Sequence, residues 1–278
     1  MRFTHISAKH NLFDLKLNEV WQYRDLIFLF TRRNFATLYK QTILGPLWLF
    51  LNPLMTGIMN MVVFSNIAKL GTDGVPQLLF YMTGQAIWGY FANCVTGNAG
   101  TFTGNAGLFG KVYFPRLTVP LSNILSNVIR FGIQMMMVFG LLFYYVATGS
   151  VQIHLLRWLL IPVLLLLLGF MGMGCGILIS SLTTKYRDLS VLVGFGMGLW
   201  MYATPVVYPM SELGEGMLRN LIQLNPVSGM VELFRWSVLG VGTVNPGSLV
   251  ISVLFTTVVL LLGIIVFNRV ERTFTDTV

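Results

Sequence analysis

The stretch "WLLIPVLLLLLGFMGMGCGILISSLTT", residues 158–184, decides the fold class because it carries no charged side chain. About 20 mostly apolar residues suffice for a helix to cross the apolar core of a bilayer, which is about 30 Å thick. Five other uncharged stretches can hold such a helix, namely residues 41–68, 74–110, 131–156, 189–211 and 236–268, whereas residues 220–231 are too few. The sequence therefore predicts an all-α integral membrane protein with six transmembrane helices.

The composition agrees with this fold class, since 55% of the 278 residues are hydrophobic and only 10% are charged. Soluble domains carry about 25% charged residues. Cys94 and Cys175 lie in apolar stretches, where a reduced thiol behaves as a small hydrophobe, so we predict no disulfide and no cysteine metal site. The histidines, His5, His10 and His154, are scattered and the acidic residues form no convincing pair. We therefore expect no catalytic residue and no metal site.

The formal net charge of +8 is explained by topology rather than by binding of nucleic acid. Membrane proteins carry most of their Lys and Arg on the cytoplasmic side, and six spans with a cytoplasmic N-terminus give thirteen such loop residues inside and four outside. The inner residues are Arg2, Lys9, Lys16, Arg24, Arg32, Arg33, Lys40, Lys111, Arg116, Lys185, Arg187, Arg269 and Arg272, and the outer ones are Lys69, Arg157, Arg219 and Arg235. Both ends of the chain, residues 1–40 and 269–278, are therefore predicted to be cytoplasmic.

Residues 19–40, "EVWQYRDLIFLFTRRNFATLYK", repeat polar and apolar positions at helical spacing. One side collects Glu19, Asp25, Arg32, Arg33 and Lys40, and the other collects Val20, Tyr23, Ile27, Phe30, Phe35 and Leu38. We interpret this pattern as an N-terminal amphipathic helix that lies in the membrane interface. A polar-faced helix of a cytoplasmic domain is the alternative, but about 40 residues are too few for a substantial core.

The predicted fourth and fifth spans each contain a pair of glycines. Gly172 and Gly176, and likewise Gly194 and Gly198, are spaced so that neighbouring helices can approach closely. A dinucleotide-binding G-x-G-x-x-G pattern would need a strand before it, and none is predicted here. We therefore expect tight helix packing at these glycines.

Residues 204–240 are interrupted by three prolines and hold apolar pieces that are too short to cross a membrane. Irregular backbone at membrane depth persists only where protein or a water-filled cavity covers it. Residues 205–240 are therefore predicted to form re-entrant or interfacial helices between spans five and six, at the outer end of a pathway.

The stretch "GNAGLFGKVYFPRLTVP", residues 104–120, raises the question of whether the chain binds a nucleotide. A P-loop needs G-x-x-x-x-G-K-[ST], whereas Gly104 precedes Gly110 and Lys111 by one residue too many and Val112 replaces the hydroxyl residue. We therefore expect no cofactor and no ATPase site in this chain. A helical piece over residues 98–109, followed by an aromatic and basic segment, suits a surface that another protein binds. An ordinary turn between spans is the alternative.

Several stretches together resemble the membrane subunit of type-2 ABC exporters that move O-antigen, capsule or teichoic acid polysaccharides. They are "YKQTILGPLWLFLNPL" after the amphipathic helix, "LFGKVYFPRLTVPL" after span two, "TTKYRDL" between spans four and five, and "TPVVYP" followed by "LNPVSGMVELFR". The resemblance covers nearly the whole chain, so that residues 41–268 correspond to the family's six-span transmembrane domain. It implies a permease for a lipid-linked polysaccharide, with O-antigen as the first expectation, in the bacterial cytoplasmic (inner) membrane.

The resemblance also implies the partners. Family members work as two permease copies with two ATPase subunits, which hold ATP and Mg²⁺, and they move a polyprenyl-diphosphate-linked glycan. ATP binding is expected to close the ATPase dimer, push the coupling helices and open a channel between the permeases. The coupling helix corresponds to residues 98–114, the interface helix to the N-terminal amphipathic helix, and the outer gate helices to residues 205–240. Within the coupling segment the expected ATPase contacts are Phe109, Lys111, Tyr113 and Arg116.

Two further groups of residues are candidates for contact with the substrate. Aromatic faces stack on sugar rings, and the rings expected to include channel-lining residues are Tyr81, Trp88, Tyr90, Phe91, Trp200, Tyr202 and Tyr208. Anchoring in the membrane interface or helix packing is the alternative for each ring. Arg24, Arg32 and Arg33 are candidates to receive the diphosphate headgroup at the inner leaflet, and anchoring on the cytoplasmic side explains them equally well.

Three other functions stay open. The first is a type-2 permease for teichoic acid, capsule, a drug or a small lipid. The second is a polytopic membrane glycosyltransferase or acyltransferase, which would need catalytic carboxylates or histidines near the membrane surface. The third is a channel or ion-coupled flippase without a partner, which would need acidic residues inside the predicted spans, and these are missing.

Overall fold

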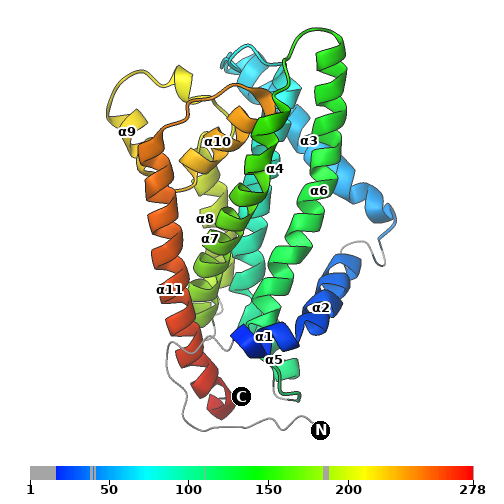
Figure 1. Ribbon diagram of the computed structural model, residues 1–278, viewed down its shortest axis with the longest axis vertical. Helices are drawn as coiled ribbons and strands as arrows, with labels where there is room; N and C mark the ends of the chain where they lie inside the picture. Colours follow the sequence, from blue (N-terminus) through cyan, green and yellow to red (C-terminus); the bar gives the residue numbers. More distant parts are fainter. Residues whose placement is uncertain (1–16, 38–39, 41, 110, 184–187, 278) are drawn as a thin grey trace.

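The computed structural model describes residues 17–37, 40, 42–109, 111–183 and 188–277, and within these residues the chain forms helices and no strand (Figure 1). The molecule is an elongated bundle whose long helices run along the vertical axis of Figure 1. These helices are α4 (Gln77–Ala99), α6 (Thr118–Ala147), α7 (Leu160–Thr183) and α11 (Pro246–Thr277). The predicted all-α class is confirmed.

Four helical segments in the described part of the chain are long and apolar enough to cross a membrane. The first, Gly45–Ile67, joins the 3-10 turn η1 (Gly45–Leu47), α3 (Trp48–Asn60) and the π-helix η2 (Met61–Ile67). The others are Thr118–Ala147, Leu155–Thr183, which joins η3 (Leu155–Leu159) to α7, and Pro246–Val270. These segments correspond to predicted spans one, three, four and six.

The other two predicted spans differ from these four. α4 has 23 residues but carries many polar side chains, and α8 (Leu189–Tyr202) has only 14 residues. α8 stops before Pro205, because proline lacks a backbone N–H and disfavours helical geometry in the residue before it. The predicted span over residues 189–211 therefore continues as a non-helical segment. A count of six crossings stays a prediction.

α4 lies inside the bundle, where it contacts α3, α6, α7, α8 and α10 (Ser228–Leu239). Most of its side chains are buried. Its polar groups find partners in the protein, as where the Asn60 amide of α3 donates to the Gln85 side-chain oxygen at 2.9 Å. Because protein covers most of its surface, α4 does not need the apolar exterior of a lipid-facing helix.

The contact between α4 and α7 depends on glycine. A Cβ atom added to Gly172 would lie 2.6 Å from the nearest atom of α4, and one added to Gly176 would lie 2.5 Å away. Carbon atoms in contact stay about 3.5–4.0 Å apart, so the predicted close approach at this pair is confirmed. The close approach predicted at Gly194 and Gly198 is not found within this chain, because nothing lies within 4 Å of a Cβ atom added to either.

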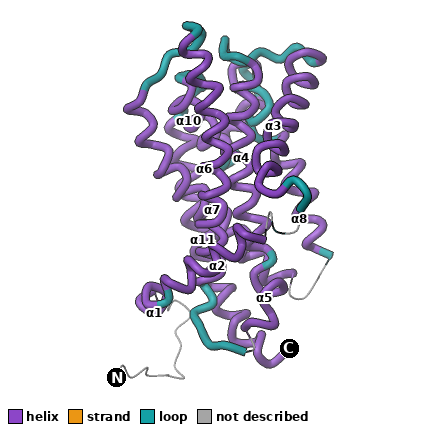
Figure 2. Tube along the Cα trace, turned by 90° about the vertical axis from the view of Figure 1, so that its right-hand side faces the viewer, coloured by secondary structure: helices purple, strands orange, loops and turns teal. Residues whose placement is uncertain are grey.

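The two ends of the bundle carry different elements. α1 (Leu17–Gln22), α2 (Arg24–Thr37), α5 (Thr101–Phe109) and the last turns of α11 lie toward the lower end in Figure 1 and Figure 2, which we name the α5 end. α9 (Met217–Leu224) and α10 lie toward the opposite end, which we name the α10 end. The short helices predicted within residues 205–240 are present as η4 (Met210–Glu212), α9 and α10. Their re-entry into the membrane stays a prediction.

We expect Gly176→Ala to destabilise the fold, because the added methyl group has to displace atoms of α4. Overpacking of this kind costs about 1–3 kcal/mol. The control, Gly140→Ala on α6, meets no atom within 4 Å and gains the better helix propensity of alanine. The measurement is the midpoint of thermal unfolding of each purified variant in detergent. Equal midpoints for the two variants would contradict the close contact between α4 and α7.

Candidate functional site

A short helix and a turn form the surface at the α5 end. α4 ends at Ala99 and α5 begins at Thr101, close to the helical piece predicted over residues 98–109. The Ser180 hydroxyl of α7 accepts the backbone N–H of Phe102 at 3.1 Å, and the Thr183 hydroxyl donates to the Ala99 carbonyl at 3.2 Å. The first turn of α5 is therefore fastened to α7 as well as to α4.

The predicted contact residues of this surface divide into two pairs. Lys111 and Tyr113 are exposed, with 62% of Tyr113 accessible. Phe109 and Arg116 are buried, and the Arg116 guanidinium lies 5.3 Å from the centre of the Phe109 ring. The outward-facing pair is accompanied by Val112, which the sequence interpretation did not select. Contact of these residues with another protein stays a prediction.

α2 packs against α6 beside this surface. The rings of Phe30 and Phe114 meet edge to face at 5.6 Å. The Asn34 amide of α2 donates to the Asn123 side-chain oxygen on α6 at 3.0 Å, and the Asn123 amide donates to the Asn98 side-chain oxygen on α4 at 3.1 Å. This chain of three asparagines connects α2, α6 and α4 close to the start of α5.

The exposed face of α1 and α2 combines apolar and basic side chains. Trp21, Phe28 and Leu29 are exposed, and so are Arg24 and Arg32. Helices that lie in a membrane interface carry this mixture, because the apolar groups enter the acyl region and the basic groups meet anionic headgroups. The face therefore suits the predicted interface helix.

Three details differ from a single amphipathic helix with one apolar side. The helix breaks at Tyr23, between α1 and α2. Phe30, from the predicted apolar side, is buried against the protein. Arg33 is exposed, but its guanidinium also contacts the protein, since it lies 4.8 Å from the Phe30 ring centre and donates to the Asn105 side-chain oxygen of α5 at 3.5 Å. Leu38 lies outside the described residues.

α8 is separated from its neighbours at the α5 end. A cleft of about 550 Å³ opens between α8 and α4, α5 and α7. Its hydroxyl-bearing lining residues are Thr96, Thr103, Thr183 and Ser190. A second cleft of about 440 Å³ between α8, α4, α7 and α11 is apolar, and Val95, Met197 and Phe255 line it. Val193 of α8 borders both clefts, so this part of α8 has open space on two sides.

Aromatic contacts hold α8 to the bundle nearer the α10 end. The Trp200 ring lies 5.3 Å from Phe91 and 6.3 Å from Trp88. The Trp200 indole N–H donates to the Asn225 side-chain oxygen at 3.1 Å, and the Asn225 amide donates to the Ala203 carbonyl at 2.8 Å. These contacts join the end of α8 to α4 and to the turn that precedes α10.

The aromatic residues predicted to line a channel occupy different environments. Four of them are buried inside the chain: Tyr81, Trp88, Tyr90 and Phe91. Tyr90, for example, donates to the Leu165 carbonyl of α7 at 3.0 Å. Trp200 and Tyr208 are half-buried, whereas Tyr202 is 54% exposed. A role in a channel stays a prediction for all seven, and Tyr202 has the most accessible ring.

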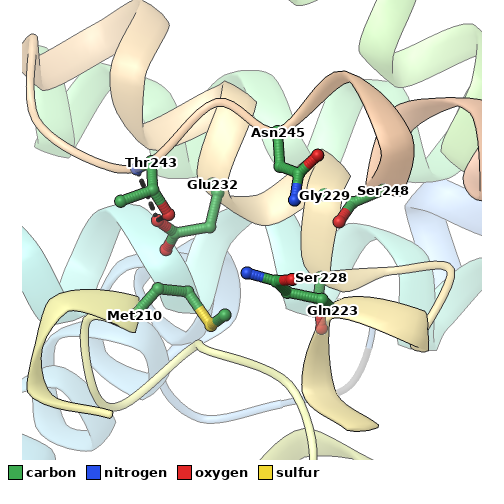
Figure 3. A pocket seen from close by; sticks show the side chains of 8 residues that line it. All are labelled: Met210, Gln223, Ser228, Gly229, Glu232, Thr243, Asn245 and Ser248. Carbon is green, nitrogen blue, oxygen red and sulfur yellow. Dashed lines mark hydrogen bonds between the residues drawn. The ribbon is translucent and has the colours of Figure 1, made fainter. Parts of the chain in front are cut away.

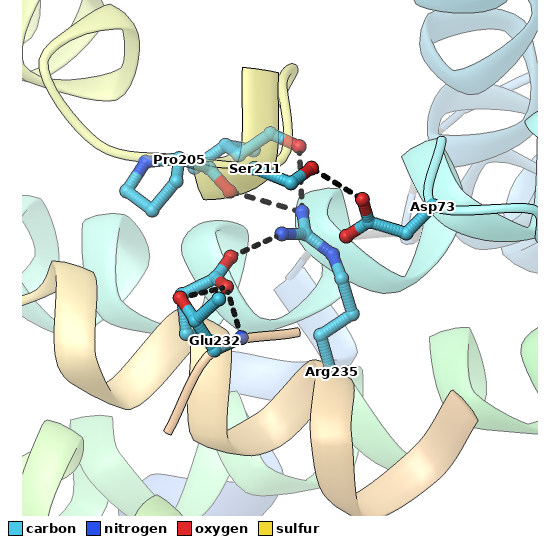
Figure 4. A network of polar contacts seen from close by, with 7 residues as sticks. Asp73, Pro205, Ser211, Glu232 and Arg235 are labelled. Atoms are coloured by element: carbon cyan, nitrogen blue, oxygen red, sulfur yellow. Dashed lines mark hydrogen bonds and ion pairs between the residues drawn. The ribbon is translucent and has the colours of Figure 1, made fainter. Parts of the chain in front are cut away.

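A buried ion pair at the α10 end was missed by the sequence interpretation, which counted Arg235 only as an outer basic residue. Arg235 and Glu232 are 1% and 3% exposed, and the guanidinium donates to a Glu232 carboxylate oxygen at 2.7 Å. It also donates to the backbone carbonyls of Pro205 and Val206 at 3.0 and 3.1 Å (Figure 4). The signal that could have found the pair is Glu and Arg three residues apart in the apolar run "GMVELFRWSVL".

A small polar cavity lies beside this ion pair (Figure 3). Its volume is about 10 Å³, which is about the space that one water molecule needs. The lining residues are Met210, Gln223, Ser228, Gly229, Glu232, Thr243, Asn245 and Ser248. The Ser228 hydroxyl is buried and makes no hydrogen bond within the described residues, so a water molecule suits the cavity. No cluster of three or more His, Cys, Asp or Glu suited to a metal ion occurs in the part of the chain that was described.

Comparison with known proteins gives one family and several relatives. The profile of the ABC-2 type transporter family matches residues 25–239. Two proteins of Klebsiella pneumoniae described as "O-antigen export system permease protein RfbA" are 28% and 29% identical over 259 and 255 residues, which cover 91% of this chain and 94% of each relative. A protein of Myxococcus xanthus with the same description is 27% identical over 223 residues, covering 79% of this chain and 82% of the relative. The chain therefore belongs to the ABC-2 type transporter family of membrane proteins.

Proposed function

We propose that this chain is the permease of an ABC transporter that exports a lipid-linked O-antigen polysaccharide across the bacterial cytoplasmic membrane, driven by ATP hydrolysis in a separate ATPase subunit. The observation that carries the proposal is the similarity to O-antigen export permeases over nine-tenths of both chains. Permeases for teichoic acid, capsule, drugs or small lipids belong to the same architectural class, so the cargo is the part that needs an experiment.

The proposed topology has six crossings, with α4 as the second and α8 together with residues 203–209 as the fifth. The α5 end is cytoplasmic in this topology. Exposed basic residues at that end support the orientation, because cytoplasmic surfaces of membrane proteins are enriched in Lys and Arg. They are Arg24, Arg32, Arg33 and Lys111.

In the proposed mechanism two copies of the permease form a conduit, and two ATPase subunits bind at α5 and the turn that follows it. Closure of the ATPase dimer on ATP pushes this surface. The hydrogen bond from Phe102 to Ser180 carries the displacement to α7, and the asparagine chain carries it to α2 and α6. Exposed Lys111 and Tyr113 are the proposed docking residues, whereas Phe109 and Arg116 support them from inside the chain.

The polyprenyl diphosphate is proposed to meet Arg24 and Arg32, which are exposed on the surface formed by α1 and α2. Arg33 contributes less in this proposal, because its guanidinium already contacts Phe30, Asn34 and Asn105. Basic residues at the inner leaflet attract anionic headgroups by about 1 kcal/mol each. The polysaccharide then passes along α8, where Tyr202 offers an exposed aromatic face.

Transport itself is the first test. We expect the chain, purified with its ATPase and reconstituted in liposomes, to move a polyprenyl-diphosphate-linked glycan across the bilayer when ATP is added. Protection of the glycan from an external glycosidase measures the movement, and a non-hydrolysable ATP analogue is the control. Glycan transfer from a sugar nucleotide by the isolated chain would show that the chain is a glycosyltransferase instead of a permease. Transport of a hydrophobic drug but no glycan would show that the cargo is a drug rather than a polysaccharide.

Docking of the ATPase is expected to depend on the exposed turn after α5. The double variant Lys111→Glu with Tyr113→Ala should copurify about tenfold less ATPase, because loss of an interface anchor costs about 2 kcal/mol or more. Met217→Ala is the control, since this side chain is 78% exposed at the opposite end. The measurement is the ratio of ATPase to permease after affinity purification. An unchanged ratio of ATPase to permease in the double variant would show that the ATPase docks on another surface.

Export is expected to slow severalfold in Tyr202→Leu, because an exposed ring that stacks on sugars is lost while the apolar volume is kept. Tyr144→Leu on α6 is the matched control, since Tyr144 is 63% exposed and α6 lines neither of the two clefts beside α8. The initial rate of glycan export in reconstituted liposomes measures the effect. Equal rates for both variants would place the sugar path away from α8.

A further inference from the structure

Residues 203–209, which we name the post-α8 segment, join α8 to η4 at the α10 end. The segment is not helical, and yet its central residues Thr204, Pro205, Val206 and Val207 are buried. Buried backbone carbonyls without a helix to supply donors have to find donors elsewhere. Those donors decide where the end of α8 can lie.

Arg235 supplies the donors for two of these carbonyls. One guanidinium nitrogen donates to Pro205 and Val206 at 3.0 and 3.1 Å, and the other donates to Glu232 at 2.7 Å (Figure 4). A guanidinium suits this place because it presents several donors in a fixed plane. The second carboxylate oxygen of Glu232 accepts the backbone N–H of Thr243 at 2.9 Å. The charge of Arg235 is thereby balanced without solvent.

α4 completes the enclosure of this arginine. The guanidinium lies 4.0 Å from the centre of the Phe80 ring. A Cβ atom added to Gly84 would lie 2.6 Å from the Val206 carbonyl oxygen and 3.0 Å from an Arg235 nitrogen. The post-α8 segment thus approaches α4 as closely as a glycine allows, and Arg235 holds it there from α10.

α8 is attached to the bundle differently at its two ends. At the α5 end α8 borders the first cleft, and the second cleft runs along α8 from Val193 to Trp200, so open space adjoins this stretch of the helix. At the α10 end it is held by the Trp200 cluster and by the post-α8 segment. Ser211 also donates to Asp73, a half-buried carboxylate that lies beside Arg235 in Figure 4, and Gly71 donates to the exposed Glu212 at 3.0 Å.

We propose that Arg235 is a positioning residue that latches the post-α8 segment to α4 and α10 and so keeps the outer end of the pathway closed. The proposal rests on the proposed transport function. Opening then requires the Pro205 and Val206 carbonyls to leave the guanidinium, and α8 moves with them. Arg235 does not contact the substrate in this scheme, and Glu232 serves to hold the guanidinium in place.

The test uses the complex of permease and ATPase in liposomes, with the reporter Val207→Cys under the latch, where the native side chain is 1% exposed. The rate at which an externally added, membrane-impermeant maleimide labels this cysteine measures opening, and the same complex without the reporter gives the background. We expect labelling of the otherwise native chain to accelerate on ATP binding. Arg235→Met should raise labelling without ATP by about tenfold or more and remove its dependence on ATP.

Further variants separate a latch from a simple ion pair. The swap Glu232→Arg with Arg235→Glu restores the charges but leaves the two carbonyls without donors, so it should label as fast as Arg235→Met. Gly84→Ala keeps every charge and displaces the Val206 carbonyl, so it should also label faster. Arg219→Met on α9 is the matched control and should label like the native chain. Recovery of slow labelling in the swap would show a simple ion pair and overturn the latch.

Two measurements distinguish failure of the latch from loss of folding and from failure of the proposed function. Variants that merely unfold lose the ATPase in copurification and are excluded by that measurement. Gly84→Ala, which keeps both members of the ion pair, then carries the test. If Arg235→Met and Gly84→Ala stay bound to the ATPase and label at the native rate, the latch is wrong even when glycan export is intact. If export by the native complex is absent while labelling responds to these variants, the proposed function is wrong and the latch stands as a conformational lock.

Discussion

Inside a bilayer every backbone polar group has to find its partner within the protein, and this constraint governs where the chain can leave a helix. The post-α8 segment is the clearest departure in the described part of the α10 end. Its carbonyls at Ala203, Pro205 and Val206 accept from side chains, the first from Asn225 and the others from Arg235. A charged side chain is buried here because it satisfies backbone that no helix can satisfy, and Glu232 makes that burial possible.

The same constraint explains why the most polar of the long helices is enclosed. α4 spans about 34 Å from its 23 residues, and it meets α7 through glycines so closely that lipid cannot enter between them. It passes into α5 at one end and carries Phe80 and Gly84 beside Arg235 near the other. One helix therefore connects the surface proposed for the ATPase with the contact proposed to close the pathway.

Sequence patterns predicted those features that depend on a single helix. Uncharged stretches gave the long helices, and the spacing of Gly172 and Gly176 gave their close packing, because both follow from length and period alone. The surroundings of individual rings on α4 were not predictable, since a helix covered on most sides has no apolar stripe to orient it. Tyr90 thus packs on α7 while Trp88 meets Trp200 of α8.

Loops that fold back on the bundle account for the remaining differences. Phe109 and Arg116 were predicted to belong to an exposed basic and aromatic segment, yet Phe109 is buried at the end of α5 and Arg116 is buried after the turn that follows. Arg235 was predicted to be a basic residue of an outer loop. Counting residues between spans does not reveal that α10 returns to pack on α4. The contacts of Arg235 with Pro205 and Val206 join residues 30 and 29 positions apart, which period and composition do not encode.

The distribution of contacts also limits how force can reach α8. The hydrogen bonds described for α5 run to α7 and α2, and those of the asparagine chain run among α2, α6 and α4, so these particular polar links do not reach α8. α8 meets α4 through the rings of Trp88, Phe91 and Trp200, and Trp200 also borders the second, apolar cleft. In the proposed mechanism a displacement of α5 reaches α8 in part near Trp200, only a few residues before the segment that Arg235 holds. In the proposed latch, a rotation of α8 about the Trp200 contacts pulls the Pro205 and Val206 carbonyls from the guanidinium, and the clefts beside α8 leave space for that rotation.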